Sequence, residues 1–215
     1  MGHAKILLNF CSDSPPSRLV VPSKLLSQQY FIIQNFTCML QIYTGNEKGK
    51  TTAALGLAVR AVGAGKRVGI VYFDKGGEAH YSERAVLRER FAGEITIVPT
   101  GLDRIDPVTN EFRFGVTEVD KQEARRGLEK AREWILSAQF DLIILDEINS
   151  TTALWMLAVE EVLEVVRMRP KELELVLTGR DAPEAFTEIA DLITDMTLVK
   201  HYFYDSVPAR AGFDF

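Results

Sequence analysis

The sequence predicts an α/β fold, a doubly wound and mainly parallel sheet of about six strands with helices on both faces. Two observations lead to this prediction. From residue 39 onward, short apolar runs alternate with longer amphipathic segments, which is the rhythm of consecutive β-α-β units. Several of the apolar runs, such as Leu142-Ile143-Ile144-Leu145, lack polar alternation, as strands do when a parallel sheet is covered on both faces.

Six apolar runs are the expected strands. They cover residues 39–43, 67–73, 95–98, 141–145, 173–177 and 196–199. The expected helices repeat apolar side chains every three or four residues and cover residues 51–62, 78–91, 119–137, 152–168 and 183–192. Ligands of such sheets bind at the carboxyl ends of the strands, so the loops after the strands are the places to search for a site.

Glycine and proline mark several of the expected helix ends. Gly63 and Gly65 suit the end of the first helix, and Pro170 stops the fourth. Pro183 fits the first turn of the last helix, with Asp181 as its cap.

Composition limits the class of protein. The 215 residues are 47% hydrophobic and 26% charged, with a formal net charge of −5, which argues against disorder and allows a substantial core. The mild acidity gives no reason to expect nucleic-acid or membrane-surface binding. No apolar run approaches the ~20 residues that span a bilayer. Two cysteines make no disulfide framework, so a reducing cytoplasm is expected.

The first 38 residues differ from the rest of the chain. They contain both cysteines, three prolines, three basic residues and one acidic residue, which gives a charge of +2 and leaves −7 for the remainder. We therefore expect one domain over residues 39–215, preceded by a segment of uncertain structure. One hypothesis is that translation starts at Met39 and that residues 1–38 are an extension.

The segment after the first expected strand has the composition of a phosphate-binding loop. It reads Thr44-Gly45-Asn46-Glu47-Lys48-Gly49-Lys50-Thr51-Thr52, which fits G-x-x-x-x-G-K-[ST] with a threonine at the first glycine position. Gly45 and Gly49 allow backbone N–H groups to point at an anion. Lys50 adds a mobile charge, and Thr51 offers a hydroxyl to Mg²⁺. The plainer alternative is a lysine-rich turn that caps an ordinary helix.

A pair of carboxylates follows the fourth expected strand. Asp146 and Glu147 come directly after Leu142–Leu145, and a phosphate-loop protein needs a carboxylate close to its magnesium. Alone, such a pair is more often the start of a solvated loop. Beside the phosphate loop, it predicts that nucleotide and Mg²⁺ bind together, with Thr51, Asp146 and Glu147 near the metal.

Other candidate residues are less specific. Arg180 follows the fifth expected strand, where it either reaches phosphates or lies in a surface turn. Arg60 serves the nucleotide or covers the sheet. No Ser-His-Asp or Cys-His arrangement is apparent. Trp134 and Trp155 fall in helical patterns and are expected in the core.

Four blocks of sequence resemble the phosphate-loop type of ATP:corrinoid adenosyltransferases, which act on cob(I)alamin or cob(I)yrinic acid a,c-diamide. In order, they are residues 43–56, Leu145-Asp146-Glu147-Ile148-Asn149, residues 177–183 and Lys200-His201, and residues 209–215 look like the closing segment of the family. The resemblance covers about residues 39–215 and is far more specific than any single motif.

The resemblance implies transfer of the 5′-deoxyadenosyl group of ATP to cobalt(I) of a reduced corrinoid, in adenosylcobalamin synthesis or salvage. Cobalt is the nucleophile, so no protein nucleophile is required. The implied catalytic residues are Lys50, Thr51 and Glu147. Taken together, the residues and the resemblance give as expected nucleotide contacts Gly45, Asn46, Lys48, Gly49, Lys50, Thr51, Thr52, Arg60 and Arg180. The resemblance also implies Mg²⁺, a cytoplasmic homodimer and a flavoprotein reductant as partner.

Two departures from the family keep alternatives open. Glu47 replaces a glycine that is more usual in the loop, and a carboxylate there repels phosphate unless Lys48 or Mg²⁺ offsets it. Many members carry Gly-Phe-x-Trp after the third strand, where this chain has Thr100-Gly101-Leu102-Asp103-Arg104. Phe112 and Phe114 either replace those aromatics or are hydrophobic side chains that anchor the loop. The alternatives are a phosphate-loop ATPase or phosphotransferase, and a noncatalytic nucleotide- or corrinoid-binding protein.

Overall fold

A six-stranded sheet organises the chain in the computed structural model, which describes residues 38–78, 80–105, 111 and 113–214. The strands are β1 (Leu40–Thr44), β2 (Val68–Tyr72), β3 (Ile95–Pro99), β4 (Leu142–Asp146), β5 (Glu174–Thr178) and β6 (Leu192–Asp195). Their order across the sheet is β3-β2-β4-β5-β1-β6, and every neighbouring pair is parallel. The predicted parallel α/β fold is therefore confirmed.

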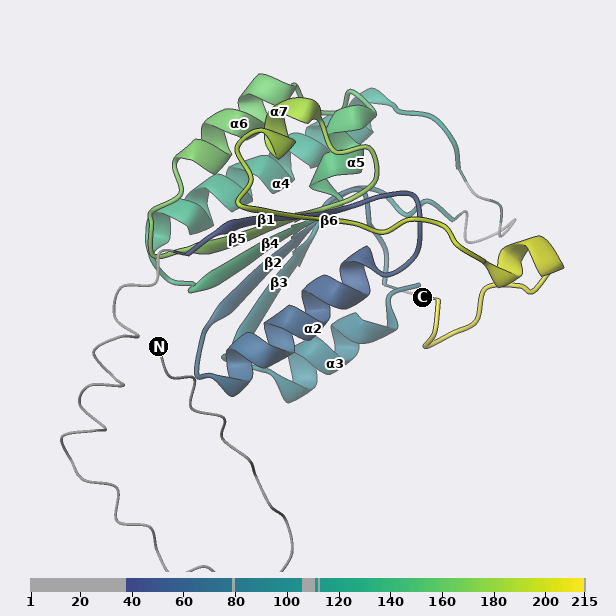
Figure 1. Cartoon of the computed structure of the whole chain (residues 1–215), viewed down its shortest axis with the longest axis horizontal. Coiled ribbons are helices and arrows are strands. Elements are labelled where there is room, and N and C mark those ends of the chain that lie inside the picture. The colour runs from purple at the N-terminus through teal and green to yellow at the C-terminus, as the bar shows by residue number, and fades with distance from the viewer. Residues whose placement is uncertain (1–37, 79, 106–110, 112, 215) are drawn as a thin grey trace, which may run out of the picture. The chain divides into compact units, whose positions relative to one another are not determined.

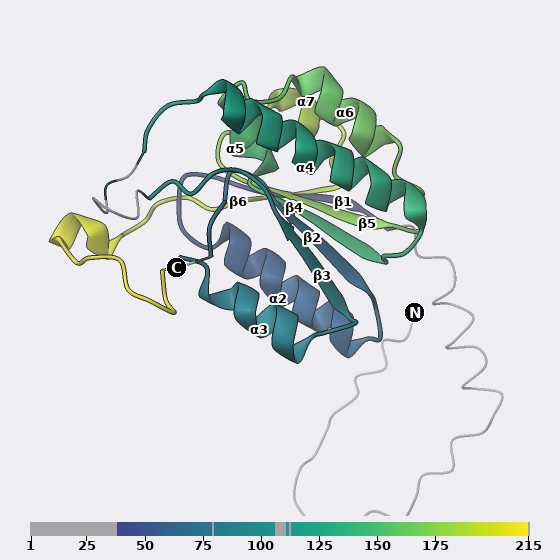
Figure 2. The ribbon, with the colours of Figure 1, turned by 180° about the vertical axis from the view of Figure 1, so that it is seen from behind.

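Helices cover both faces of this sheet (Figures 1 and 2). One face carries α2 (Lys50–Gly63) and α3 (Ser82–Arg90). The other carries α4 (Glu118–Ser137), α5 (Ile148–Ala153), α6 (Val159–Arg167) and α7 (Glu184–Thr187). The chain changes face after β3. Because the strands are parallel, the loops after β1 and β4 leave the same carboxyl edge of the sheet, and only β5 lies between these two strands.

The core consists of two apolar layers, one on each face. Along β4, Leu142 and Ile144 belong to the layer that includes residues of α2 and α3. The alternate residues Ile143 and Leu145 belong to the layer that includes residues of α4, α6 and α7. All four side chains are buried, and each such burial contributes roughly 1.5–3 kcal/mol. Burial on both faces explains why the sequence of this strand lacks polar alternation.

The expected helix over residues 183–192 and the expected strand over residues 196–199 are wrong. The helix α7 is only four residues long, and β6 occupies Leu192–Asp195. Asp191 decides this, because its N–H donates to the Leu40 carbonyl and its carboxylate accepts from the Leu40 N–H at 2.7 Å. These bonds start the pairing of the chain with β1 at residue 191. The strand therefore forms from residues 192–195 and not from residues 196–199. The cap assignment is also wrong, because Pro183 is the N-cap residue and Asp181 has a φ of 52° outside the helix.

The single helix expected over residues 152–168 is two helices. The first, α5, begins at Ile148, directly after Glu147, and the second, α6, begins at Val159. Trp155 lies in the break with a left-handed φ of 59°, and it is 85% exposed. Its expected place in the core is therefore wrong, whereas Trp134, a residue of α4, is buried in the core as expected.

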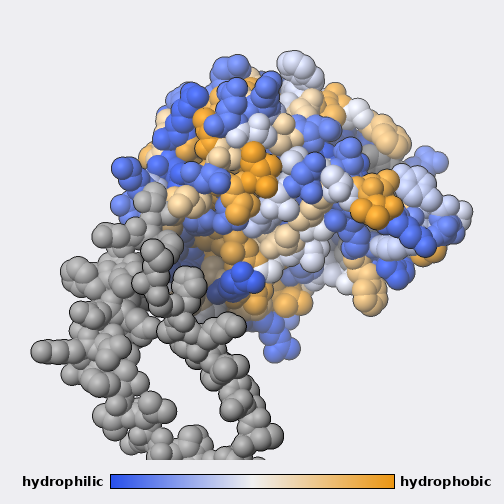
Figure 3. Space-filling view, viewed as in Figure 1, coloured by the Kyte–Doolittle hydropathy of each residue, from blue (hydrophilic) through white to orange (hydrophobic). Residues whose placement is uncertain are grey.

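The β6 edge of the sheet leaves apolar side chains at the surface. Leu192 and Ile193 point to opposite faces of this strand and are 45% and 47% exposed. The space-filling view shows apolar surface between the two helical layers, at the level of this edge (Figure 3). Among the described helices, none is long and apolar enough to cross a membrane.

Phe186 tests how far the short helix α7 contributes to the core. Its side chain is fully buried in the layer formed with α4 and α6. We expect Phe186→Ala to lower the free energy of unfolding by about 3–5 kcal/mol, because it removes a buried ring and leaves a cavity. Urea unfolding measures this change. Phe203→Ala is the matched control, since that ring is 70% exposed, and an equal loss in both variants would contradict the packing described.

Candidate active site

The loop between β1 and α2 curls around its own lysine. Gly45 and Gly49 adopt φ values of 96° and 123°, which glycine reaches readily and other residues do not. A Cβ atom at Gly45 would also lie 2.4 Å from the carbonyl oxygen of Met196. The Lys50 ammonium donates to the carbonyls of Gly45 and Glu47, both at 2.7 Å. The loop therefore has the shape and the central cation of a phosphate-binding loop.

The surroundings of Lys50 favour a bound anion. Burial lowers the pKa of its ammonium, and the charges of Arg180 and Lys75 lower it further. Glu147 and Glu47 act in the opposite direction but do not outweigh these effects. An anion placed among these cations would relieve their mutual repulsion.

Two carboxylates face this loop from the end of β4. Asp146 is 1% exposed and accepts a hydrogen bond of 2.6 Å from the Thr178 hydroxyl. Its second oxygen lies 3.3 Å from the hydroxyl of Thr51, which donates to it. Glu147 has a left-handed φ of 66°, and its N–H donates to Thr178 at 3.0 Å. The three residues expected near a metal, Thr51, Asp146 and Glu147, are thus brought together.

Sequence reasoning missed Lys75, which lies in the loop after β2. Its ammonium is 2.5 Å from an oxygen of Asp146 and 3.2 Å from an oxygen of Glu147. Burial alone would lower the pKa of this lysine, but the two carboxylates raise it above its usual range. The only sequence signal was its position in Asp74-Lys75-Gly76-Gly77 at the carboxyl end of an expected strand.

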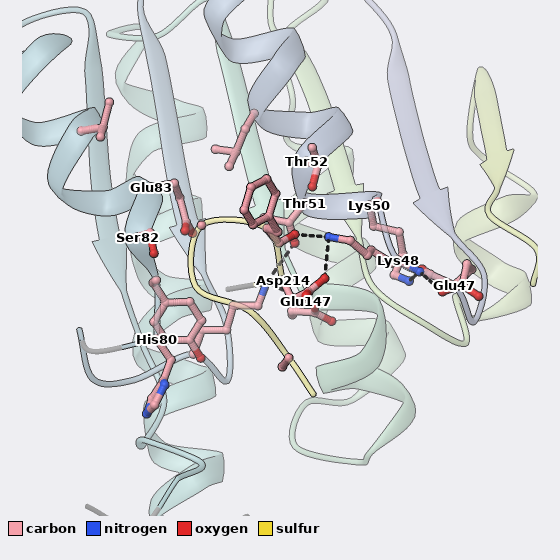
Figure 4. Close-up of a pocket in the computed structure, with 18 of the residues that line it drawn as sticks. Glu47, Lys48, Lys50, Thr51, Thr52, His80, Ser82, Glu83, Glu147 and Asp214 are labelled. Atoms are coloured by element: carbon pink, nitrogen blue, oxygen red, sulfur yellow. Dashed lines mark hydrogen bonds and ion pairs between the residues drawn. The ribbon is translucent and has the colours of Figure 1, made fainter. Parts of the chain in front are cut away.

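A cavity of about 810 Å³ opens in front of these groups. Figure 4 shows Lys48, Thr51, Glu147 and Asp214 close together at it. Its polar lining includes, from the expected site residues, Lys48, Gly49, Lys50, Thr51, Thr52, Glu147 and Arg180. Gly45, Asn46 and Asp146 belong to the same loops but not to the lining. Arg60 lies apart, in the last turn of α2, roughly 15 Å from Lys50 along the helix axis.

The same cavity has an apolar wall between α2 and α3. Its side chains are Leu55, Val59, Val86, Leu87 and Phe91. Val59 and Val86 are about half exposed, although they lie in helices that bury their other faces against the sheet. A polar end and an apolar wall in one cavity suit a ligand with a charged part and a flat, less polar part.

The C-terminal segment closes over the phosphate loop. The Lys48 ammonium donates to the Phe213 carbonyl and forms an ion pair of 3.3 Å with Asp214 (Figure 4). His201 places its Nε2 atom 3.4 Å from the carboxylate of Glu47, which also accepts the N–H of Lys48 at 2.7 Å. The unusual carboxylate of Glu47 is therefore engaged by groups of the loop and the C-terminal segment. Sequence reasoning named the closing segment but did not place it in the site.

The loop after β3 is held by ion pairs. Arg104 donates to Asp74 at 2.8 Å and to the Gly115 carbonyl at 2.7 Å, and Arg113 pairs with Asp120 at 2.7 Å. Phe114 is 85% exposed and does not line the cavity. Phe112, the other candidate to replace the missing aromatics, lies outside the described residues.

Comparison with known proteins settles the class. The sequence profile of the ATP:corrinoid adenosyltransferase family BtuR/CobO/CobP matches residues 37–215. The chain belongs to this family. The resemblance predicted from the four sequence blocks is confirmed, and with it the class of the enzyme, a transferase of an alkyl group that uses ATP and a corrinoid.

Individual proteins are also similar in sequence to this chain. The corrinoid adenosyltransferase of Escherichia coli K12 is 34% identical over 81% of this chain and 84% of that protein. The corrinoid adenosyltransferase of Pseudomonas aeruginosa is 34% identical over 82% and 83%. An uncharacterized protein of Nostoc sp. is 35% identical over 78% of this chain, which spans only 46% of that longer protein.

A solved structure supports the fold. The KaiC-like protein of Pyrococcus horikoshii superposes with a TM-score of 0.51 over 77% of this chain and 74% of that chain. The two sequences are 17% identical, so the likeness concerns the fold alone.

Asp120 provides a test of the ion pairs that hold the β3 loop. Hydrogen bonds from Arg113 and Thr117 lower the pKa of this buried carboxyl well below its usual range. We expect Asp120→Asn to lower the free energy of unfolding at pH 7 by about 1–3 kcal/mol. Because the folded pKa is depressed, the contribution is complete above the unfolded pKa of ~3.9 and is lost as the pH falls towards the folded value.

Urea unfolding at pH 7 and at about pH 3 measures the difference. The control is Glu118→Gln, in the same helical turn but with an exposed carboxylate paired to Lys121, which we expect to leave stability nearly unchanged because solvent screens the pair. A deficit of Asp120→Asn that stays constant between the two pH values would contradict this assignment.

Proposed function

We propose that the protein transfers the 5′-deoxyadenosyl group of ATP to cobalt(I) of a reduced corrinoid and releases triphosphate, in adenosylcobalamin synthesis or salvage. One observation carries the proposal. In a chain of this family, the phosphate loop around Lys50 faces the side chains of Thr51, Asp146 and Glu147 beside one large cavity.

The triphosphate belongs at the polar end of the cavity. Backbone N–H groups of residues 45–52 and the ammonium of Lys50 would bind its oxygens, with Lys48, Thr52 and Arg180 at the rim. The leaving triphosphate gains negative charge as the bond to the 5′ carbon breaks, and cations already in place stabilise that charge. The protein then needs no nucleophile of its own, because cobalt(I) attacks the carbon.

The residues present fit a magnesium ion. Thr51 offers a hydroxyl, and Asp146 and Glu147 offer carboxylate oxygens at the edge of the loop. Among the described residues, no three His, Cys, Asp or Glu side chains converge as a metal cage. This suits Mg²⁺, which takes one or two carboxylates and completes its shell with water and phosphate oxygens. When bound, the ion would screen the charge of the triphosphate.

The apolar wall is the proposed place for the flat parts of the substrates. The side chains of α2 and α3, with Tyr202, Phe203 and Phe213 of the C-terminal segment, offer nonpolar surface beside the phosphate loop. In many family members, aromatic residues after the third strand contact the corrinoid. In this chain the residues of the apolar wall would make that contact instead, since Phe114 does not line the cavity.

The remaining expectations belong to this proposal. A homodimer would cover the exposed Leu192 and Ile193 of the β6 edge, since exposed sheet edges favour pairing with another chain. A flavoprotein reductant and a cytoplasmic location would suit a reaction that needs cobalt(I). The division into an N-terminal segment over residues 1–38 and a domain over residues 39–215 also remains a prediction.

Products separate this function from its alternatives. The protein would be incubated with ATP, Mg²⁺ and a chemically reduced corrinoid, and we expect a light-sensitive adenosylated corrinoid together with triphosphate. An ATPase or phosphotransferase would release phosphate or ADP instead. Binding of ATP with neither spectral conversion nor triphosphate would indicate a noncatalytic protein and refute the proposal.

Lys50 is the most direct target for mutation. We expect Lys50→Ala to abolish turnover, with a loss of at least about 10²–10³-fold, because a cation that stabilises the leaving group is removed. Triphosphate release measures the effect. Lys66→Ala is the control, because Lys66 pairs with Asp141 before β4 and is 55% exposed. A Lys50→Ala protein that works at the wild-type rate would refute the assigned triphosphate contact.

A further inference from the structure

A protein cation lies where the groups of the proposed magnesium site converge. The Lys75 ammonium is 2.5 Å from Asp146 Oδ2 and 3.2 Å from Glu147 Oε1. It also donates to the Thr51 hydroxyl at 3.0 Å. These three oxygens are the ones that the sequence assigned to Mg²⁺, so the ammonium and the metal ion would compete for the same ligands.

The loop that presents Lys75 is fixed from behind by a buried arginine. Arg84 is fully buried, and its guanidinium donates to the carbonyls of Lys75 at 2.7 Å and of Gly77 at 2.6 Å. The guanidinium lies 3.8 Å from the ring centre of Tyr81 and 4.6 Å from that of Tyr72. The Lys75 N–H adds a bond of 3.0 Å to the carbonyl of Thr100. The backbone of Lys75 is therefore held in place, so any movement of the ammonium requires rotation of the side chain.

The Lys75 ammonium balances the charge of two neighbouring carboxylates. Asp146 is almost completely buried, and Glu147 lies beside it. Two neighbouring carboxylates repel each other, and burial removes their solvation. A cation that lies between them offsets both costs. Lys75 supplies that cation from the protein itself. It also lines the same cavity as Lys50, so rotation of its four-carbon stem would take the ammonium toward a phosphate group.

We propose that Lys75 is an internal counter-ion that holds the cation position of the nucleotide-free protein and moves to the triphosphate when Mg²⁺ enters with ATP. Lys75 is thus a positioning residue that makes the binding of a divalent cation depend on the nucleotide. The inference rests on the proposed ATP and Mg²⁺ site and adds an order of binding to it.

Binding of Mn²⁺ without nucleotide tests this inference, with the free ion followed by its electron paramagnetic resonance signal. We expect the full-length wild-type protein to bind Mn²⁺ weakly until ATP is added. Lys75→Met removes the charge but keeps the length of the side chain, and we expect it to bind Mn²⁺ alone at least about tenfold more tightly. Lys75→Arg keeps the charge and should behave as the wild type, as should the distant control Lys66→Met.

A second measurement concerns ATP without metal. We expect Lys75→Met to bind metal-free ATP about tenfold more weakly than the wild type, because the triphosphate has lost the ammonium that would move to it. Arginine at position 75 should restore most of this affinity. A merely structural role for Lys75 would weaken Mn²⁺ binding instead of strengthening it.

Two results would overturn the inference. One is a Lys75→Met protein that binds Mn²⁺ alone no more tightly than the wild type. The other is tight nucleotide-independent Mn²⁺ binding by the wild type, and this measurement decides the matter even if the variant does not fold. Failure of the wild type to bind ATP at all would refute the proposed function instead, so the two failures are distinguishable.

Discussion

The site depends on the contacts of one buried carboxylate. Asp146 accepts hydrogen bonds from Thr178 at the end of β5, from Lys75 after β2 and from Thr51 at the start of α2. Three segments that are far apart in the sequence thus meet at one side chain at the carboxyl edge of the sheet. A buried carboxylate is costly unless it is paired, so the same charge that prepares a cation site also requires these segments to stay together.

The topology of the sheet makes this convergence possible. Because β5 lies between β1 and β4, the phosphate loop and the carboxylates leave the sheet about two strand spacings apart, roughly 10 Å. Side chains from both loops bridge that separation, and the cavity opens in front of them. The change of face after β3 keeps α2 and α3 together, and they form the apolar wall of the cavity.

The C-terminal segment contacts a part of the phosphate loop that differs from the usual family sequence. Glu47 stands where a glycine is more usual, and His201 and the N–H of Lys48 engage its carboxylate. Asp214 pairs with Lys48 at the same rim. A residue that looked unfavourable for phosphate binding in the sequence therefore belongs to a contact between the loop and the end of the chain, more than 150 residues away.

The parallel fold, the phosphate loop and the family could be predicted from the sequence, because each rests on local patterns: unbroken apolar strands, a glycine-rich turn and contiguous motifs. The sequence also placed Thr51, Asp146 and Glu147 at one edge, because the carboxyl ends of parallel strands always share an edge. The short α7 and the position of β6 depend on a long-range contact, since Asp191 bonds to Leu40 across about 150 residues. The break at Trp155, between α5 and α6, was likewise visible only in the three-dimensional structure. The tertiary structure alone brought Lys75 between the carboxylates, because no local pattern shows which charges meet across strands that are neighbours in space and distant in sequence.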